Sequence, residues 1–337
     1  MTALSGASIE DRLAAYLQPR FDQPVAITQL RRFPVGFSWI TYGFTLETGG
    51  ERRELILRIA PESGILPPYR AAPEFAVLSA VEALKLPIPR ALWHSDDPAD
   101  LGAPFIICTK SPGSAPLMSR KLIQSGGGDL PDLARQFVDH LAKLHGFAWE
   151  GTEFAGLVDP ATRENAALAE LGRWNARLDS VMMRPEPVME WARRWLTANA
   201  PVAPRVVLVH GDYRLGNFLA DGARITGLLD WEMAHLGDPQ EDLGWALMPD
   251  FNGLTDRLFG VMERSEVYDR YAAAGGAVID PAAIDYYGIM ARYKLVCICF
   301  SALHAFMALG TNDVRTAMLA SQRAGITAQL SELADRL

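Results

Sequence analysis

The chain has 337 residues, of which 49% are hydrophobic and 21% charged, a composition typical of a globular protein rather than a disordered one. Its net charge of −8 disfavours nucleic acid as a partner, because phosphate backbones require a concentrated basic surface. Cys108, Cys297 and Cys299 lack companion ligands at zinc-site spacing, so we interpret them as buried thiols in a reducing compartment.

The first part of the chain predicts a small mixed lobe. The hydrophobic pattern indicates a helix at 9–17, strands at 27–35, 39–47 and 54–59, a helix at 73–84 and a strand at 104–108. The turn signal Thr48-Gly49-Gly50 separates the second and third strands. This order, β-β-β-α-β, is typical of an antiparallel sheet that carries one helix.

The pattern changes after Gly113. Helices are expected at 133–145 and 168–199, the second with a break at Pro185 and Pro187, and again from Leu243 to the end. Short strands at 206–209 and 225–229 bracket a polar loop. The sequence therefore predicts an α+β protein with an N-terminal lobe at 1–112 and a larger, mainly helical C-terminal lobe at 113–337.

The longest apolar stretch, 289–309, is interrupted by Arg292, Lys294 and His304. Such charges are expensive inside a bilayer, so this stretch predicts a buried helix rather than a membrane span. The N-terminus has no apolar signal core. We expect a soluble, cytoplasmic protein without a membrane partner.

The most informative segment is LVHGDYRLGNFL at 208–219, followed by ITGLLDWEMAHLGDP at 225–239. Asp212 and Asn217 lie in a loop after one strand, and Asp230 lies at the end of the next. Oxygen ligands of this kind suit Mg²⁺, and phosphoryl transfer needs both such a metal and a group that orients a hydroxyl. Taken singly, each residue could belong to a turn, a helix cap or a strand end; together, their order matches the catalytic loop and metal-binding aspartate of protein kinases.

The string HGDYRLGN resembles the H-G-D-x-x-x-x-N loop of the aminoglycoside phosphotransferase and choline kinase family. The segments DWE and GDPQEDLGW resemble further motifs of that family, with Gly244 where alanine is common. The resemblance implies a two-lobed, protein-kinase-like fold and a small-molecule kinase. It implies Asp212 as catalytic base, His210 as the residue that orients the loop, Asn217 and Asp230 as Mg²⁺ ligands, and Asp238 and Asp242 as supports of the loop.

The small lobe carries weaker signals. The segment FPVGFSWITYGF is the candidate hairpin over the nucleotide phosphates, with Gly36 and Ser38 near the phosphate oxygens, although it lacks G-x-G-x-x-G and fits an ordinary hairpin equally well. Glu74 fits the family glutamate that pairs with a strand lysine. That lysine is absent, since the first lysine in the chain is Lys85, and Arg58 takes its position. An arginine there could pair with Glu74 and reach phosphate, or displace the nucleotide.

The resemblance and the order of the elements imply that the strand ending at Thr109 connects to the second lobe, with Ile107 and Thr109 as contacts of the nucleotide base. We therefore expect a kinase that uses Mg²⁺ and ATP, with GTP as an alternative donor, to phosphorylate a hydroxyl of a small molecule. A nucleotide-binding regulator without turnover and a metal-dependent phosphohydrolase are the alternatives. The chain has no P-loop, no H-E-x-x-H helix and no G-x-S-x-G turn.

The sequence does not identify the small molecule that accepts the phosphoryl group. Glu186, Glu190 and Asp250 could attract a cationic amino-sugar or form a solvated face. The segments LRIAP and RPEPVMEWARRWL are similar to kinase-like domains fused to acyl-CoA dehydrogenases, which implies a hydroxyacyl thioester such as a hydroxyacyl-CoA instead. Choline is disfavoured because no aromatic cage is evident.

Overall fold

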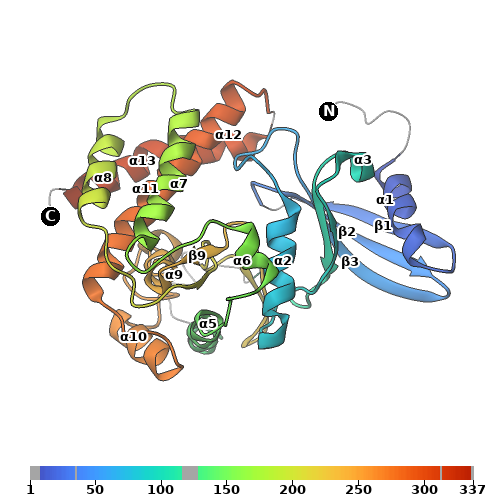
Figure 1. Cartoon of the computed structure of the whole chain (residues 1–337), viewed down its shortest axis with the longest axis horizontal. Helices are drawn as coiled ribbons and strands as arrows, with labels where there is room; N and C mark the ends of the chain where they lie inside the picture. Colours follow the sequence, from blue (N-terminus) through green and yellow to red (C-terminus); the bar gives the residue numbers. More distant parts are fainter. Residues whose placement is uncertain (1–7, 35, 116–127, 312, 335–337) are drawn as a thin grey trace.

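The computed structural model describes residues 8–34, 36–115, 128–311 and 313–334. The chain forms two lobes, a sheet-bearing N-terminal lobe and a larger helical C-terminal lobe, with α2 between them (Figure 1). The predicted α+β, two-lobed class is confirmed, and the three cysteines are free and buried as expected.

One five-stranded antiparallel sheet forms the N-terminal lobe, in the order β1-β2-β3-β5-β4. The elements of this lobe are α1 (Ile9–Leu17), β1 (Val25–Phe33), β2 (Ile40–Thr48), β3 (Glu51–Ile59), α2 (Ala71–Val81), β4 (Ala91–Ser95), α3 (Pro98–Leu101) and β5 (Phe105–Thr109), with short 3₁₀ turns at Gln18–Arg20 and Glu82–Leu84. The predicted helices and strands are present, so this part of the sequence analysis is confirmed.

The sequence analysis missed β4. This strand is five residues long, lies at an edge of the sheet and pairs only with β5. It follows Pro87 and Pro89, in the stretch between the predicted helix at 73–84 and the predicted strand at 104–108. An edge strand pairs on one side only, and five residues are too few to show a clear alternation of apolar and polar side chains.

Alternate residues of β3 point to opposite faces of the sheet. Leu55, Leu57 and Ile59 of β3 point into the core between the sheet and α1, so Arg58 points from the opposite face. In α2, four buried residues (Ala76, Val77, Leu78 and Val81) pack into the main core of the C-terminal lobe, while Ala71 packs against the N-terminal lobe. Helix α2 is thus shared by both lobes, and the boundary at residue 112 remains a prediction.

The C-terminal lobe is mainly helical. Its helices are α5 (Leu130–His145), α6 (Glu153–Leu157), α7 (Ala166–Val181), α8 (Pro187–Ala198), α9 (Pro239–Ala246), α10 (Arg264–Ala273), α11 (Pro281–Met307), α12 (Val314–Ser321) and α13 (Arg323–Ala334), with a 3₁₀ turn at Pro249–Phe251. The predicted break at Pro185 and Pro187 separates α7 from α8.

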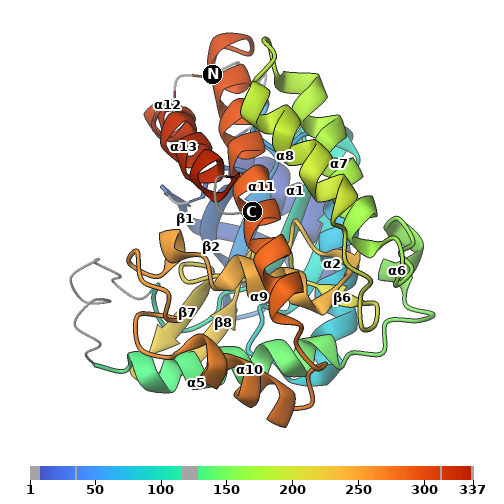
Figure 2. The same cartoon turned by 90° about the vertical axis from the view of Figure 1, so that its left-hand side faces the viewer.

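Helix α11 is the centre of this lobe and lies between the α7–α8 pair and the α12–α13 pair (Figure 2). By length and hydropathy it could cross a membrane, but 67% of its most apolar window is buried inside the fold. It also contains Lys294, whose ammonium is ion-paired in the core. Both properties are typical of a core helix.

Two small antiparallel ribbons hold the polar loop of the C-terminal lobe. Strand β6 (Val207–Val209) pairs with β9 (His235–Gly237), and β7 (Phe218–Asp221) pairs with β8 (Arg224–Leu228). The sequence predicted β6 and β8 but not their partners, which are three and four residues long. Segments this short show no measurable alternation.

Besides the packing of α2, two connecting segments are held against the C-terminal lobe. After β5, Ser114 forms a two-bond bridge with Ala220 of β7, at 3.0 and 2.9 Å. The connection between β3 and α2 is also held against the C-terminal lobe, because Ile65 packs against α11 and Arg177 of α7 donates a 2.8 Å hydrogen bond to the Pro67 carbonyl.

Candidate active site

The polar loop between β6 and β7 is fixed by its backbone. The N–H groups of His210 and Gly211 donate to the carboxylate of Asp242 at 2.8 and 2.9 Å. Gly211 has φ = +83°, and a Cβ at this position would lie 2.5 Å from the Met233 carbonyl oxygen. Only glycine satisfies both requirements, which explains the Gly in HGD.

Asp242 is itself buried and held in place. It accepts a 3.1 Å hydrogen bond from His145 Nε2, and the other ring nitrogen of His145 lies 2.6 Å from the Tyr271 hydroxyl. Burial alone raises the pKa of Asp242, but the bonds from His145 and His210 outweigh it and lower the pKa below its usual value. Asp242 is therefore the support of the loop that the sequence predicted, whereas Asp238 caps α9 through the N–H of Gln240.

His210 lies on the inner side of the loop. Its Nδ1 accepts the N–H of Asp212 at 3.3 Å, and its Nε2 lies 3.1 Å from the Leu229 carbonyl oxygen. One nitrogen accepts and the other donates, which is the hydrogen-bonding pattern of a neutral imidazole. Burial lowers its pKa, in agreement with that state. His210 thus ties Asp212 to the residue preceding Asp230.

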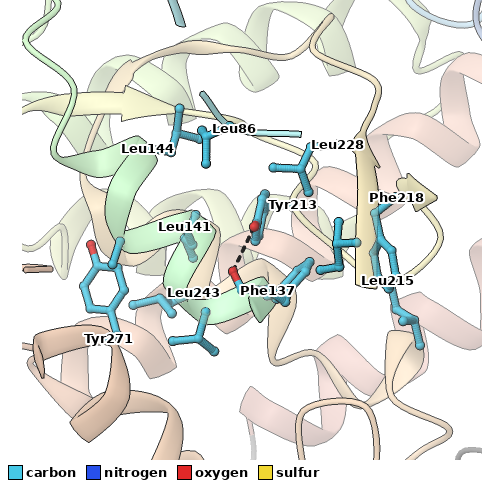
Figure 3. Packing of buried hydrophobic residues seen from close by; sticks show 14 of the residues in the cluster. Leu86, Phe137, Leu141, Leu144, Tyr213, Leu215, Phe218, Leu228, Leu243 and Tyr271 are labelled. Carbon is cyan, nitrogen blue, oxygen red and sulfur yellow. Dashed lines mark hydrogen bonds between the residues drawn. The ribbon is translucent and has the colours of Figure 1, made fainter. Parts of the chain in front are cut away.

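Tyr213 anchors the loop from the other side. Its ring lies in the core between α5 and β7, and its hydroxyl donates to the Phe137 carbonyl at 2.8 Å (Figure 3). The residue directly after Asp212 is therefore immobilised by packing.

The carboxylate of Asp212 receives three donors. Trp245 Nε1 and Arg214 Nε each donate to Oδ1 at 2.8 Å, and the side-chain amide of Asn217 donates to Oδ2. A carboxylate held at both oxygens has a fixed orientation, which a general base requires. Arg214 and Trp245 were not among the residues predicted to form the site.

Asn217 and Asp230 suit a hard cation. The amide nitrogen of Asn217 is committed to Asp212, and among the residues that the structure describes no donor reaches its Oδ1, which can therefore serve as a ligand atom. Asp230 uses Oδ1 in an ion pair with Arg58 at 2.8 Å, and within the described residues its Oδ2 has no partner. Asp230 also has φ = +70°, an uncommon conformation that is concentrated at functional sites. Two free carbonyl and carboxylate oxygens beside Asp212 fit Mg²⁺.

Arg58 forms the ion pair with Glu74 that the sequence predicted. One of its terminal nitrogens contacts Glu74 and the other contacts Asp230, so the guanidinium connects the N-terminal lobe to the aspartate of DWE. Its side chain is 16% exposed and remains charged because both carboxylates face it. Arg58 thereby reproduces the geometry expected of the absent lysine, with an additional bond to Asp230.

Two neighbouring carboxyl groups are strongly perturbed. Burial, opposed by Arg58, raises the pKa of Glu74 to about 7. Burial and the nearby charge of Asp230 raise the pKa of Glu232 to about 8. The hydroxyl of Ser38 lies 2.6 Å from Glu232 Oε2. Raised pKa values mean that the carboxyl groups crowded around Arg58 are not all ionised at neutral pH, and a divalent cation bound here would favour their ionised forms.

The remaining predicted nucleotide contacts are Gly36, Ile107 and Thr109. Gly36 belongs to the β1–β2 connection and has φ = +78°. The side chain of Ile107 is buried in the sheet core, and the N–H of Thr109 donates to the Arg90 carbonyl at 3.0 Å. Contacts of Ile107 and Thr109 with a nucleotide base remain predictions, and no ion pair or hydrogen bond joins them to Arg58 in the described residues.

A buried charge cluster that the sequence analysis did not predict lies next to Trp245. Lys294 Nζ lies 2.9 Å from Glu170 and 2.8 Å from Glu241, and His235 Nε2 lies 3.1 Å from Glu241. Glu170, His235 and Glu241 have the spacing of a metal site. The ammonium of Lys294 already occupies the position between the two glutamates, so the cluster is complete without a metal. Lys294 also lies 5.2 Å from the ring of Trp245.

Two lobes, an arginine–glutamate pair on one sheet face and an Asp-Asn-Asp arrangement opposite it define a kinase-like phosphotransferase fold. Residues 29–287 match the model of the phosphotransferase enzyme family. The match covers more than half of the chain, and the protein belongs to this family of kinase-type enzymes.

Among curated proteins, mouse (Mus musculus) acyl-CoA dehydrogenase family member 10 is 27% identical over 233 residues, which is 65% of this chain and 20% of that protein. The chain therefore spans about a fifth of the length of this relative. The similarity predicted to acyl-CoA dehydrogenase fusions is thereby confirmed.

Among solved structures, a protein of Ralstonia eutropha JMP134, provisionally described as an aminoglycoside phosphotransferase, has a TM-score of 0.72 at 19% identity, over 96% of this chain and 98% of that one. A thermostable mutant of aminoglycoside phosphotransferase APH(4)-Ia, in complex with AMP-PNP and hygromycin B, has a TM-score of 0.52 at 17% identity over 94% of this chain and 97% of that one. At these identities the likeness shows the fold.

Proposed function

We propose that the protein transfers the γ-phosphoryl group of ATP to a hydroxyl group of a small molecule. The observation that carries this proposal is the carboxylate of Asp212, held by three donors beside the free amide oxygen of Asn217. This arrangement provides a fixed proton acceptor next to oxygen ligands for a cation. GTP is an alternative donor, since no residue contact defines the base.

In this mechanism Asp212 orients the acceptor hydroxyl and takes its proton as the oxygen attacks the phosphorus. Arg58, held by Glu74, contributes positive charge toward the phosphate oxygens. Asn217 and Asp230 would hold Mg²⁺, which supplies charge neutralisation on the phosphates when bound. His210 and Asp242 keep the loop rigid. The rate enhancement would come from positioning and electrostatics.

A second candidate function is nucleotide binding without turnover. The observation in its favour is Arg58, whose guanidinium bridges Glu74 and Asp230 in place of the slimmer lysine. A bulky, planar group at this point would compete with phosphate oxygens for space. The acceptor also remains a proposal: an amino-sugar, in line with the hygromycin B bound by the structural neighbour, or a hydroxyacyl thioester.

The decisive experiment combines binding and turnover. Thermal unfolding with Mg²⁺ and ATP is expected to show stabilisation of about 3 kcal/mol at a hundredfold excess over Kd. ATP consumption is then measured with amino-sugars, hydroxyacyl thioesters and amino alcohols, and one class should be phosphorylated. Binding without turnover on the whole panel would support the regulator instead. Phosphate release from phosphoesters without nucleotide would support a hydrolase.

The variant Trp245→Phe tests whether the fixed orientation of the Asp212 carboxylate contributes to catalysis. The substitution removes one N–H donor to Asp212 and keeps an aromatic ring in the buried position. A hydrogen bond to a charged group contributes about 1.5–3 kcal/mol, so kcat should fall about 10- to 100-fold. The KM for ATP should change little, because in the described residues the Trp245 side chain contacts Asp212, Phe251 and Lys294 rather than Arg58 or the proposed Mg²⁺ ligands.

Trp149→Phe is the matched control for this prediction. Its indole N–H donates to the Val206 carbonyl at 3.1 Å, away from Asp212, and its loss should leave kcat unchanged. An equal fall of kcat in both variants, or a rise in KM alone for Trp245→Phe, would contradict the role assigned to Trp245.

A further inference from the structure

A cavity of about 410 Å³ lies where the two lobes meet. Its walls come from the β3–α2 connection, α2, α6, α7 and the segment that follows Asp230. This volume is within the range of small-molecule sites. Asp212, Asn217 and His210 are not among the lining residues, so the cavity lies beside the proposed phosphoryl-transfer centre, which it borders through Glu74, Trp231 and Glu232.

Arg177 of α7 is the most informative residue of this cavity. Its guanidinium is oriented by the carbonyl oxygens of Ile65 and Pro67, at 3.4 and 2.8 Å. It forms no ion pair with any residue that the structure describes, and burial lowers its pKa. A partly desolvated cation without a counter-ion is costly, and an anion would offset that cost.

Among the described residues, the carboxylates that line the cavity form no ion pair with Arg177. Glu74 is paired with Arg58, Glu170 with Lys294 and Arg173, and Glu232 contacts the Ser38 hydroxyl. Arg70 also lines the cavity and, in the described part of the chain, has no ion pair. The remaining carboxylate, Asp159, lies exposed at the rim.

The rest of the lining is apolar and aromatic. Trp39 and Trp174 contribute their rings, and Phe154 and Leu157 of α6 form another part of the wall. The guanidinium of Arg177 lies 6.0 Å from the ring of Trp174. Aromatic walls beside a fixed cation suit a ligand with one acidic group and an apolar body, rather than an inorganic ion alone.

We propose that this cavity binds a small organic anion, with its carboxylate or phosphate group at Arg177 and its apolar body between the tryptophans. This binding site goes beyond the proposed phosphoryl transfer and does not depend on it. The acidic residues considered for a cationic amino-sugar do not oppose it, because each faces an arginine: Glu186 faces Arg323, Glu190 faces Arg194 and Asp250 faces Arg292.

The test uses four probes of similar size on the full chain: phenyl phosphate, benzoate, neutral benzyl alcohol and cationic benzylamine. Binding is measured by ligand-observed NMR with Mg²⁺ and AMP-PNP in saturating amounts, so that the probes cannot report on a nucleotide site. We expect binding of one or both anions and none of benzyl alcohol or benzylamine. Phenyl phosphate and benzoate then distinguish a phosphate from a carboxylate ligand.

Arg177→Gln is expected to weaken anion binding about tenfold, since it removes the charge but keeps a donor for the Pro67 carbonyl. Arg194→Gln, on the exposed side of α8, is the matched control and should bind like the wild type. If Arg177→Gln does not fold, Arg70→Gln replaces it, because Arg70 is exposed. Equal binding of all four probes, no binding of either anion, or unchanged affinity in the cavity variants would overturn the proposal.

The test of anion binding does not depend on whether the protein phosphorylates an acceptor. Anion binding without phosphorylation of any acceptor would leave the cavity assignment intact and count against the proposed kinase activity. Phosphorylation of an acceptor without anion binding would support the kinase activity and overturn the cavity assignment.

Discussion

Asp212→Asn is expected to lower kcat about 100- to 10,000-fold, the usual contribution of a general base. Asparagine has nearly the same shape, so Trp245 and Arg214 can still donate to its oxygen, but an amide does not accept the proton of the acceptor hydroxyl. The change should leave Mg·ATP binding within about threefold, because the proposed metal ligands remain. Steady-state kinetics and thermal shift with Mg²⁺ and ATP measure the two quantities.

Asp221→Asn is the control for this substitution. Asp221 ends β7, in the hairpin that follows the loop, and is exposed. It should retain wild-type kcat. Full turnover in Asp212→Asn would remove the catalytic-base assignment, while loss of nucleotide stabilisation in that variant would indicate that Asp212 acts in metal binding.

Lys294→Met is expected to destabilise the fold by about 3–5 kcal/mol, the usual cost of removing one partner from a buried ion pair. The ammonium lies between Glu170 and Glu241, and the side chain is 1% exposed. Methionine fills much of the volume but leaves two buried carboxylates with less positive charge. Urea unfolding measures the free energy, and Lys143→Met on the exposed side of α5 should change it by less than about 0.5 kcal/mol.

The pH dependence of this variant gives an independent check. Burial lowers the pKa of His235, but Glu170 and Glu241 outweigh this and raise it above its usual value of 6.5. Stability from the charged imidazole is therefore complete below that value and is lost as the pH rises through the raised pKa. The loss in Lys294→Met should be smaller near pH 6 than near pH 8. Adding Glu241→Gln should recover part of the loss at both values, and a variant as stable as the wild type would contradict the ion-pair explanation.

The sequence predicted the parts of the site that are close together in the chain. Asp212 and Asn217 are five residues apart on one loop, and Asp230 follows a recognisable strand, so spacing alone indicates their chemistry. Arg58 and Glu74 lie on adjacent elements, and the structure forms the ion pair expected of them. The order of residues along the chain is sufficient to predict contacts between residues that are close in sequence.

Contacts between distant segments could not be predicted in this way. Trp245 reaches Asp212 only because α9 packs against β6, and Glu170 meets Lys294 only because α7 packs against α11. The strand β9 exists through pairing with β6, which is far from it in sequence. Trp245 belongs to the segment GDPQEDLGW, but that motif does not say which side chain the indole meets, and the three-dimensional packing supplies this information.

Helix α2 and Arg58 link the arrangement of the two lobes to the charges of the site. Four residues of α2 pack into the core of the C-terminal lobe, while Glu74 of the same helix is paired with Arg58 of β3. The second terminal nitrogen of Arg58 contacts Asp230, which lies in the C-terminal lobe. A displacement of the sheet relative to α2 or to Asp230 therefore breaks one of these two ion pairs. The alignment of the lobes and the position of the positive charge at the site are thus coupled.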